Sequence, residues 1–301
     1  MEAGPPAAVW PGPLVSPSWL AASLGPSVVV LDATVRLPAA THDGDYRPAS
    51  AREQFAAGHI PTARYADLLG DLSDHTAPYH FARPSAARLA AALGQLGVTD
   101  ASVVICYDAA GGSWAARLWW MLHWIGVRAA VLDGGWPGWL ASGGAVESGA
   151  PQAPDLPGTG HGAPAVTVRE RPGMWAGLAD VLDVVSGARA GALVCALSEE
   201  LFAGTAPTRY ARRGHIPSSL SLPARTLLTP GGQLRPLGEL REAVARIPDA
   251  APVTVYCGGG ISAAVVAHAL LLTGREDVSI YDGSLEEWSA NAELPLDLGL
   301  E

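Results

Sequence analysis

The sequence has few cysteines, and nothing in their spacing connects them. Cys106, Cys195 and Cys257 are scattered over 301 residues. A disulfide framework needs more cysteines at closer spacing. Neither a C-x-x-C pair nor a histidine cluster offers the spacing of metal ligands. We therefore expect reduced thiols, no metal and no other cofactor.

Charge and long apolar runs are also scarce. Charged residues make up 16% of the chain, the net charge is −10, and there is no long basic run. This disfavours a general nucleic-acid or anionic-membrane binder, although a pocket can still be locally positive. The longest apolar stretches, 115–125 and 261–272, are too short to span a bilayer. Residues 1–10 lack the features of a signal peptide, so we expect a cytoplasmic protein without membrane or nucleic-acid partners.

What the sequence does contain is an internal repeat. Three segments recur in the same order, which a duplication explains better than coincidence. They are residues 58–61 and 214–217 (Gly-His-Ile-Pro in both), 104–108 and 253–257, and 132–139 and 281–288. The stretch between the copies is rich in proline and glycine, which is typical of a surface linker. We predict domains at 1–146 and 166–301, joined by a linker at 147–165.

Each copy alternates short apolar runs with helical patterns. The expected strands are 28–32, 102–107 and 129–132 in the first copy, and 193–196, 253–256 and 278–281 in the second. The expected helices of the first copy are 51–57, 85–96 and 114–125. Apolar, β-branched runs of this length suit buried parallel strands. The alternation predicts an α/β fold in which a mostly parallel sheet is flanked by helices.

The strongest candidate for chemistry is Cys257. It directly follows an apolar strand, and ligands collect at the carboxyl ends of strands in open α/β sheets. The loop after it, predicted to cradle an anion with its backbone N–H groups, consists of Gly258, Gly259, Gly260, Ile261 and Ser262. Its glycines allow a tight turn, and the following helix N-terminus adds partial positive charge that favours the thiolate. A purely structural role fits Cys106 and Cys195 better, because both lie inside apolar strands.

Together these segments, with Ser-Asp-His-Thr-Ala-Pro-Tyr at 73–79, resemble the tandem-domain rhodaneses, the thiosulfate and 3-mercaptopyruvate sulfurtransferases. The resemblance covers almost the whole chain outside the linker. It implies two tandem rhodanese-like domains, of which only the C-terminal one is reactive. Asp108 stands at the position equivalent to Cys257, and an aspartate cannot accept a sulfane sulfur. The first domain would therefore be catalytically silent and would help to wall a pocket between the domains.

The resemblance also implies a mechanism and partners. The Cys257 thiolate would take sulfur from a small-molecule donor, hold it as a persulfide and pass it to an acceptor in a ping-pong reaction. Cyanide, small thiols and thioredoxin-like or sulfur-carrier proteins are the implied acceptors. Thiosulfate-preferring members typically have cationic residues in the two positions after the cysteine. Mercaptopyruvate-preferring members usually have Gly followed by Ser there. Here Gly258 and Gly259 follow Cys257, so the donor preference stays open.

The substrate-binding residues depart from the family pattern. Leu201 stands where a substrate-binding arginine is expected, and Arg209 corresponds to a second one, with Arg212 and Arg213 as alternatives. His80 falls within one residue of a family histidine. The resemblance therefore implies Arg209 and His80 as candidate substrate-binding residues.

Two other functions compete with sulfur transfer. A phosphatase built on a cysteine loop needs Cys-x5-Arg, and the position of that arginine is Ala263 here. A catalytically inactive rhodanese-fold binding or regulatory module is the stronger rival. The resemblance implies aspartate and arginine at positions where this chain has Cys195, Leu197 and Leu201. Titration of the Cys257 thiol would discriminate, since a binding module has no need of a reactive one.

Overall fold

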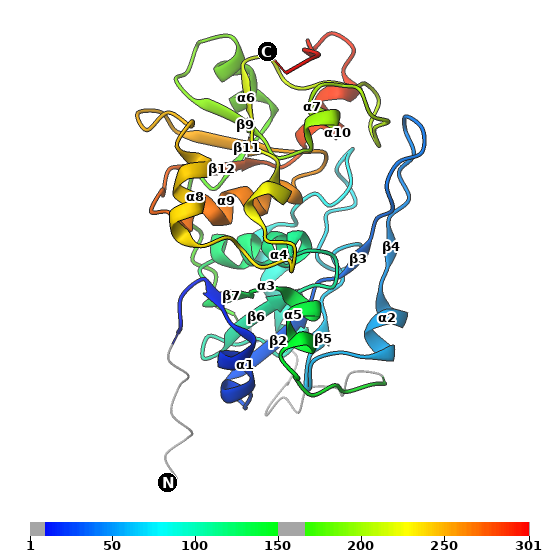
Figure 1. The fold of residues 1–301 in the computed structure, drawn as a ribbon, viewed down its shortest axis with the longest axis vertical. Helices are drawn as coiled ribbons and strands as arrows, with labels where there is room; N and C mark the ends of the chain where they lie inside the picture. Colours follow the sequence, from blue (N-terminus) through cyan, green and yellow to red (C-terminus); the bar gives the residue numbers. More distant parts are fainter. Residues whose placement is uncertain (1–9, 150–165, 301) are drawn as a thin grey trace.

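Each half of the chain contains one five-stranded sheet. The computed structural model describes residues 10–149 and 166–300 (Figure 1). In the first half the strand order is β1 (Leu14–Val15), β7 (Ala129–Leu132), β6 (Val103–Tyr107), β2 (Val28–Asp32) and β5 (Arg64–Tyr65). In the second half it is β10 (Ser219–Ser221), β9 (Ala192–Cys195), β11 (Val253–Tyr256), β12 (Val278–Tyr281) and β8 (Trp175–Ala176). All neighbouring strands in both sheets are parallel, which confirms the predicted α/β class.

Helices flank both sheets. Those of the first half are α1 (Pro17–Ser23), α2 (Arg52–Ala57), α3 (Ala86–Gln95), α4 (Ser113–Trp124) and α5 (Gly135–Ala141). Those of the second half are α6 (Leu178–Val185), α7 (Glu199–Phe202), the 3-10 helix η1 (Ala224–Leu227), α8 (Leu237–Val244), α9 (Ser262–Leu272) and α10 (Ser284–Ala290). A separate antiparallel pair joins β3 (Val35–Arg36) to β4 (Ala49–Ser50). Strands β2, β6 and β11 are buried along their whole length, as continuous apolar strands covered on both faces should be.

The two domains pack together through α4 and α9. Figure 1 shows these helices against one another between the two sheets. Alanines line much of α9 and let the helices approach closely, and the Trp119 ring of α4 lies 4.3 Å from the His268 ring of α9. One buried apolar cluster therefore runs from the first sheet into the second without a break at the domain boundary. No helix in the described ranges is long and apolar enough to cross a membrane.

The repeated Gly-His-Ile-Pro turns form the same hydrogen bonds in each domain. The His59 imidazole donates to the Phe55 carbonyl at 2.8 Å, and the His215 imidazole donates to the Phe202 carbonyl at 2.9 Å. The His59 backbone pairs with Glu147, the first residue of the predicted linker, and that of His215 pairs with Asp297. Residues 150–165 of that predicted linker lie outside the described residues.

Candidate active site

Cys257 is fixed at the carboxyl end of β11, where the chain turns into α9. Its side chain is buried, with 2% of the residue exposed. Its backbone N–H donates to the Ser284 hydroxyl at 3.2 Å, and its carbonyl accepts from the Leu285 N–H at 3.0 Å. The first turn of α10 thus holds the start of the loop in place.

The other end of the loop is held by the first domain. Gly260 adopts a φ of +74°, and its carbonyl lies 3.5 Å from the Arg117 guanidinium of α4. The same guanidinium donates to the Asp282 carboxylate at 2.6 Å and to the Phe81 carbonyl at 2.8 Å. Arg117 is 1% exposed, so this is a buried ion pair between the domains.

The first domain contains the same loop with a carboxylate in it. Asp108 follows β6, and α4 begins at Ser113, the spacing that separates Cys257 from Ser262. The Asp108 carboxylate accepts three backbone hydrogen bonds, from Ala110 at 2.7 Å, Gly112 at 2.9 Å and Ala115 at 2.8 Å. This strand-to-helix loop therefore directs three backbone N–H donors at the carboxylate in its centre. The equivalent N–H groups in the second domain belong to Gly259, Ile261 and Ala264.

Cys257 opens into a cavity of about 330 Å³ between the domains, which we call the inner cavity. Its first-domain wall includes Tyr46 and Trp114, and its second-domain wall includes Leu201 and Tyr210. Gly258, Gly259, Ile261 and Ser262 of the predicted loop also line it. Gly260 does not, because its carbonyl faces Arg117.

Two tyrosines that line the inner cavity stay protonated. Burial raises the pKa of Tyr46 and that of Tyr210 far above the ordinary tyrosine value. The Tyr210 hydroxyl is fully buried next to the Thr208 side chain. Tyr210 therefore contributes its ring to the cavity wall beside Gly258, while its hydroxyl is buried behind that wall.

Of the three candidate arginines, Arg209 alone lines the inner cavity. Its guanidinium donates to the Pro38 carbonyl at 2.6 Å, which bridges the two domains. Arg212 instead donates to carbonyl groups around the end of α10, and Arg213 pairs with Asp43 at 2.9 Å. Of the three, Arg209 is therefore the one that we retain as a candidate for binding substrate.

His80 is not part of the inner cavity. Its half-exposed imidazole donates a hydrogen bond to the Glu286 carboxylate of α10 and packs on Tyr46, with ring centroids 4.3 Å apart. It lines a different surface hollow, together with residues 73–75 and 77–79. The expectation that His80 binds substrate stays a prediction: the structure places the imidazole in a contact with Glu286 between the domains, beside the cavity rather than in its lining.

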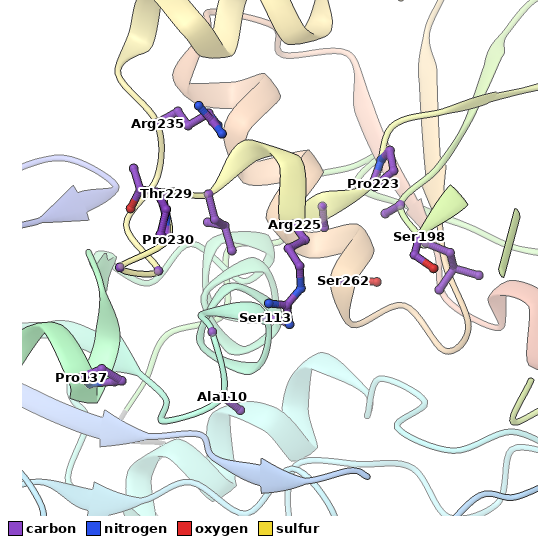
Figure 2. A pocket seen from close by; sticks show the side chains of 17 residues that line it. Ala110, Ser113, Pro137, Ser198, Pro223, Arg225, Thr229, Pro230, Arg235 and Ser262 are labelled. Atoms are coloured by element: carbon purple, nitrogen blue, oxygen red, sulfur yellow. The ribbon is translucent and has the colours of Figure 1, made fainter. Parts of the chain in front are cut away.

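Sequence reasoning missed Arg225. This residue lies in η1, four positions after β10 ends, and lines the inner cavity opposite the loop of the first domain. Figure 2 shows its side chain pointing from η1 toward Ala110 and Ser113. The one feature of the sequence that could have indicated Arg225 is its position shortly after the carboxyl end of a strand. That strand has three residues and is too short to show a periodic pattern.

Comparison with known proteins places the chain in the rhodanese-like domain family. The model of the rhodanese-like domain family matches residues 17–142 and 200–291. A 3-mercaptopyruvate sulfurtransferase of Escherichia coli K12 is 31% identical over 288 residues, which cover 94% of this chain and 97% of that protein. A thiosulfate sulfurtransferase of Rattus norvegicus is 32% identical over 293 residues, covering 93% and 92%. The solved structure of SseA from Escherichia coli, described as a 3-mercaptopyruvate sulfotransferase, superposes with a TM-score of 0.75 at 30% identity and covers 92% of this chain and 99% of that one.

Proposed function

Because this chain belongs to the rhodanese-like family and is a sulfurtransferase, we propose that it transfers sulfur through a persulfide on Cys257. The donor is thiosulfate or 3-mercaptopyruvate, and the acceptor is cyanide or a thiol, including thiols of thioredoxin-like or sulfur-carrier proteins. The observation that carries the proposal is the Asp108 carboxylate held by three backbone N–H groups. In the second copy of this loop a persulfide anion on Cys257 would occupy the equivalent place.

The first half of the reaction loads the cysteine. The Cys257 thiolate attacks the outer sulfur of thiosulfate, the S–S bond breaks and sulfite leaves with the electron pair. With 3-mercaptopyruvate the thiolate attacks the thiol sulfur and the C–S bond breaks. The electron pair stays on carbon, which takes up the thiol proton and leaves as pyruvate. Both routes end in the same Cys257 persulfide anion, which the loop amides stabilise.

The surrounding residues bind the donor. Arg209 is proposed to bind its carboxylate or sulfonate, which is supported by its position in the lining of the inner cavity. The first domain, at residues 1–146, is proposed to be catalytically silent, because Asp108 occupies the cysteine position. It contributes a wall of the cavity and the Arg117 clamp on the loop.

An inactive binding module remains the second candidate. Leu197 and Leu201 line the inner cavity on the side where the family resemblance predicts polar residues. An apolar wall there would weaken donor binding without disturbing the fold. The two candidates differ in what they require of the Cys257 thiol.

A sulfur-transfer assay separates them. Purified protein is offered thiosulfate or 3-mercaptopyruvate with cyanide, alongside Cys257→Ser, and thiocyanate is measured. We expect turnover in the wild type and none in Cys257→Ser, and iodoacetamide should modify Cys257 first. Burial raises the pKa of Cys195 to about 12 and that of Cys106 still further, so these thiols provide an internal control. Absence of turnover with an unreactive Cys257 would favour the binding module.

A further inference from the structure

A second and larger cavity adjoins the inner one. It has a volume of about 720 Å³ and lies between the first-domain loop after β6 and the second-domain segment 223–235 (Figure 2). We call it the outer cavity. Cys257 does not line it, but the two cavities share five residues, which are Ala110, Ser113, Leu197, Arg225 and Ser262. The outer cavity is therefore adjacent to the site of the proposed persulfide.

Hydrogen bonds fix the second-domain wall of the outer cavity. The Leu234 N–H donates to the Asp133 carboxylate of the first domain at 2.8 Å, and the Thr229 hydroxyl pairs with the Gln233 side chain at 2.8 Å. Arg235 donates to the Thr226 carbonyl and to Glu239, each at 2.8 Å. These bonds fix the segment that closes the cavity on the second-domain side.

The charge of the two cavities is opposite to that of the whole chain. Arg209, Arg225 and Arg235 line them, and no aspartate or glutamate is among the described residues that do so, although the net charge of the protein is −10. Arg235 is already paired with Glu239. The Arg225 guanidinium makes no hydrogen bond or ion pair with any residue of the described ranges, and it stands where the cavities meet. This arrangement suits an anionic ligand that reaches from the outer cavity toward Cys257.

We infer that the outer cavity is the binding site of the sulfur acceptor, a low-molecular-weight thiol of peptide size whose carboxylate is bound by Arg225. The inference rests on the proposed persulfide function and adds the class of acceptor. A donor of a few atoms fits within the inner cavity of about 330 Å³, which leaves the larger space for a larger molecule. In a ping-pong reaction the donor and the acceptor react at the same cysteine sulfur in turn, so they can bind through different contacts.

The transfer step needs no further reactant. The acceptor thiolate attacks the outer sulfur of the Cys257 persulfide, and a new S–S bond forms on the acceptor. The S–S bond to Cys257 breaks, and its electron pair returns Cys257 to the thiolate. The acceptor leaves as a persulfide anion, so charge and sulfur are conserved.

The test isolates this second step. Cys257 is first loaded with donor, and loading is verified by the added mass of one sulfur atom. Discharge is then followed in single-turnover experiments with glutathione as the anionic thiol and 2-mercaptoethanol as the neutral one. The ratio of their half-saturation concentrations is compared among the wild type, Arg225→Ala and Arg225→Lys. Arg241→Ala is the matched control, because Arg241 is an exposed arginine on α8 that lines neither cavity.

We expect Arg225→Ala to raise the half-saturation concentration of glutathione, relative to that of 2-mercaptoethanol, about tenfold. Loss of one charged hydrogen bond has an effect of this size. Arg225→Lys should restore part of the difference, and Arg241→Ala should leave the ratio at the wild-type value. An unchanged ratio in Arg225→Ala would overturn the inference while the persulfide function stands. Discharge by reduced thioredoxin but not by excess glutathione would overturn it equally. Failure of both donors to load Cys257 would overturn the proposed function itself, and this inference with it.

Discussion

At the scale of single residues, the Cys257 loop contains two neighbouring glycines in very different surroundings. A Cβ at Gly260 would lie 2.9 Å from the Arg117 guanidinium and 3.1 Å from the Asp282 carbonyl, and φ is +74° there. A Cβ at Gly259 would meet nothing closer than 3.5 Å, the distance to a Glu286 carboxylate oxygen.

We therefore expect Gly260→Ala to lower the free energy of unfolding by about 1–3 kcal/mol, because strain and crowding add. The rate of thiocyanate formation should fall as well, because the loop amides would shift relative to the sulfur. Gly259→Ala is the matched control for stability and should unfold nearly as the wild type does. Urea denaturation of both variants checks this, and equal losses of stability would contradict the described loop geometry.

The same scale shows which site residues a sequence can reveal. The cysteine loop could be predicted because its chemistry lies in one short segment, a strand end followed by glycines and a helix. Arg225 could not, because its relevance arises only when η1 packs against the loop of the other domain. The contact of His80 with Glu286 was equally hidden, because Glu286 is distant in sequence and comes from the second domain.

At the scale of elements, α4 is more than a packing helix because it brings a buried cation to the second domain. Arg117 pairs with Asp282 and stacks over the Trp175 ring at 4.7 Å. We expect Arg117→Met to lower the free energy of unfolding by about 3–5 kcal/mol, because it leaves a buried carboxylate without its partner. Urea denaturation measures the loss.

A double variant distinguishes the charge from the shape of the arginine. Arg117→Met combined with Asp282→Asn removes both charges and should recover part of the stability lost in the single variant. If the double variant is as unstable as the sum of the two single ones, the arginine acts through packing alone. In that case the ion pair would not be what joins α4 to the loop.

Elements were predictable where they are long and periodic. The six expected strands agree to within one residue with β2, β6, β7, β9, β11 and β12. The edge strands β1, β5, β8 and β10 were missed, because two or three residues carry no period and pair only once the sheet exists. Helix α9 was recognised as apolar, but a helix that is buried on all sides has no polar face to indicate which neighbours surround it.

At the scale of the whole molecule, the seam between α4 and α9 contains two histidines that the fold keeps neutral. Burial lowers the pKa of His268 to about 4, and burial together with the positive charge of Arg171 lowers that of His123 to about 4. The His268 imidazole donates to the Pro13 carbonyl at 3.1 Å. The unfolded chain, whose histidines titrate near the ordinary value, therefore binds more protons than the folded protein in mild acid.

This difference predicts acid sensitivity of the domain seam. As the pH falls from about 6.5 toward 4, protons bind the unfolded chain first, and His268 should cost up to about 3 kcal/mol of unfolding free energy. His268→Gln retains a donor for Pro13 but does not titrate, so its stability should fall less over the same interval. Buried Asp133, whose raised pKa acts in the opposite direction, is common to both proteins and cancels in the comparison. Urea denaturation between pH 7 and pH 4.5 measures both slopes, and identical slopes would show that His268 already binds a proton in the folded protein.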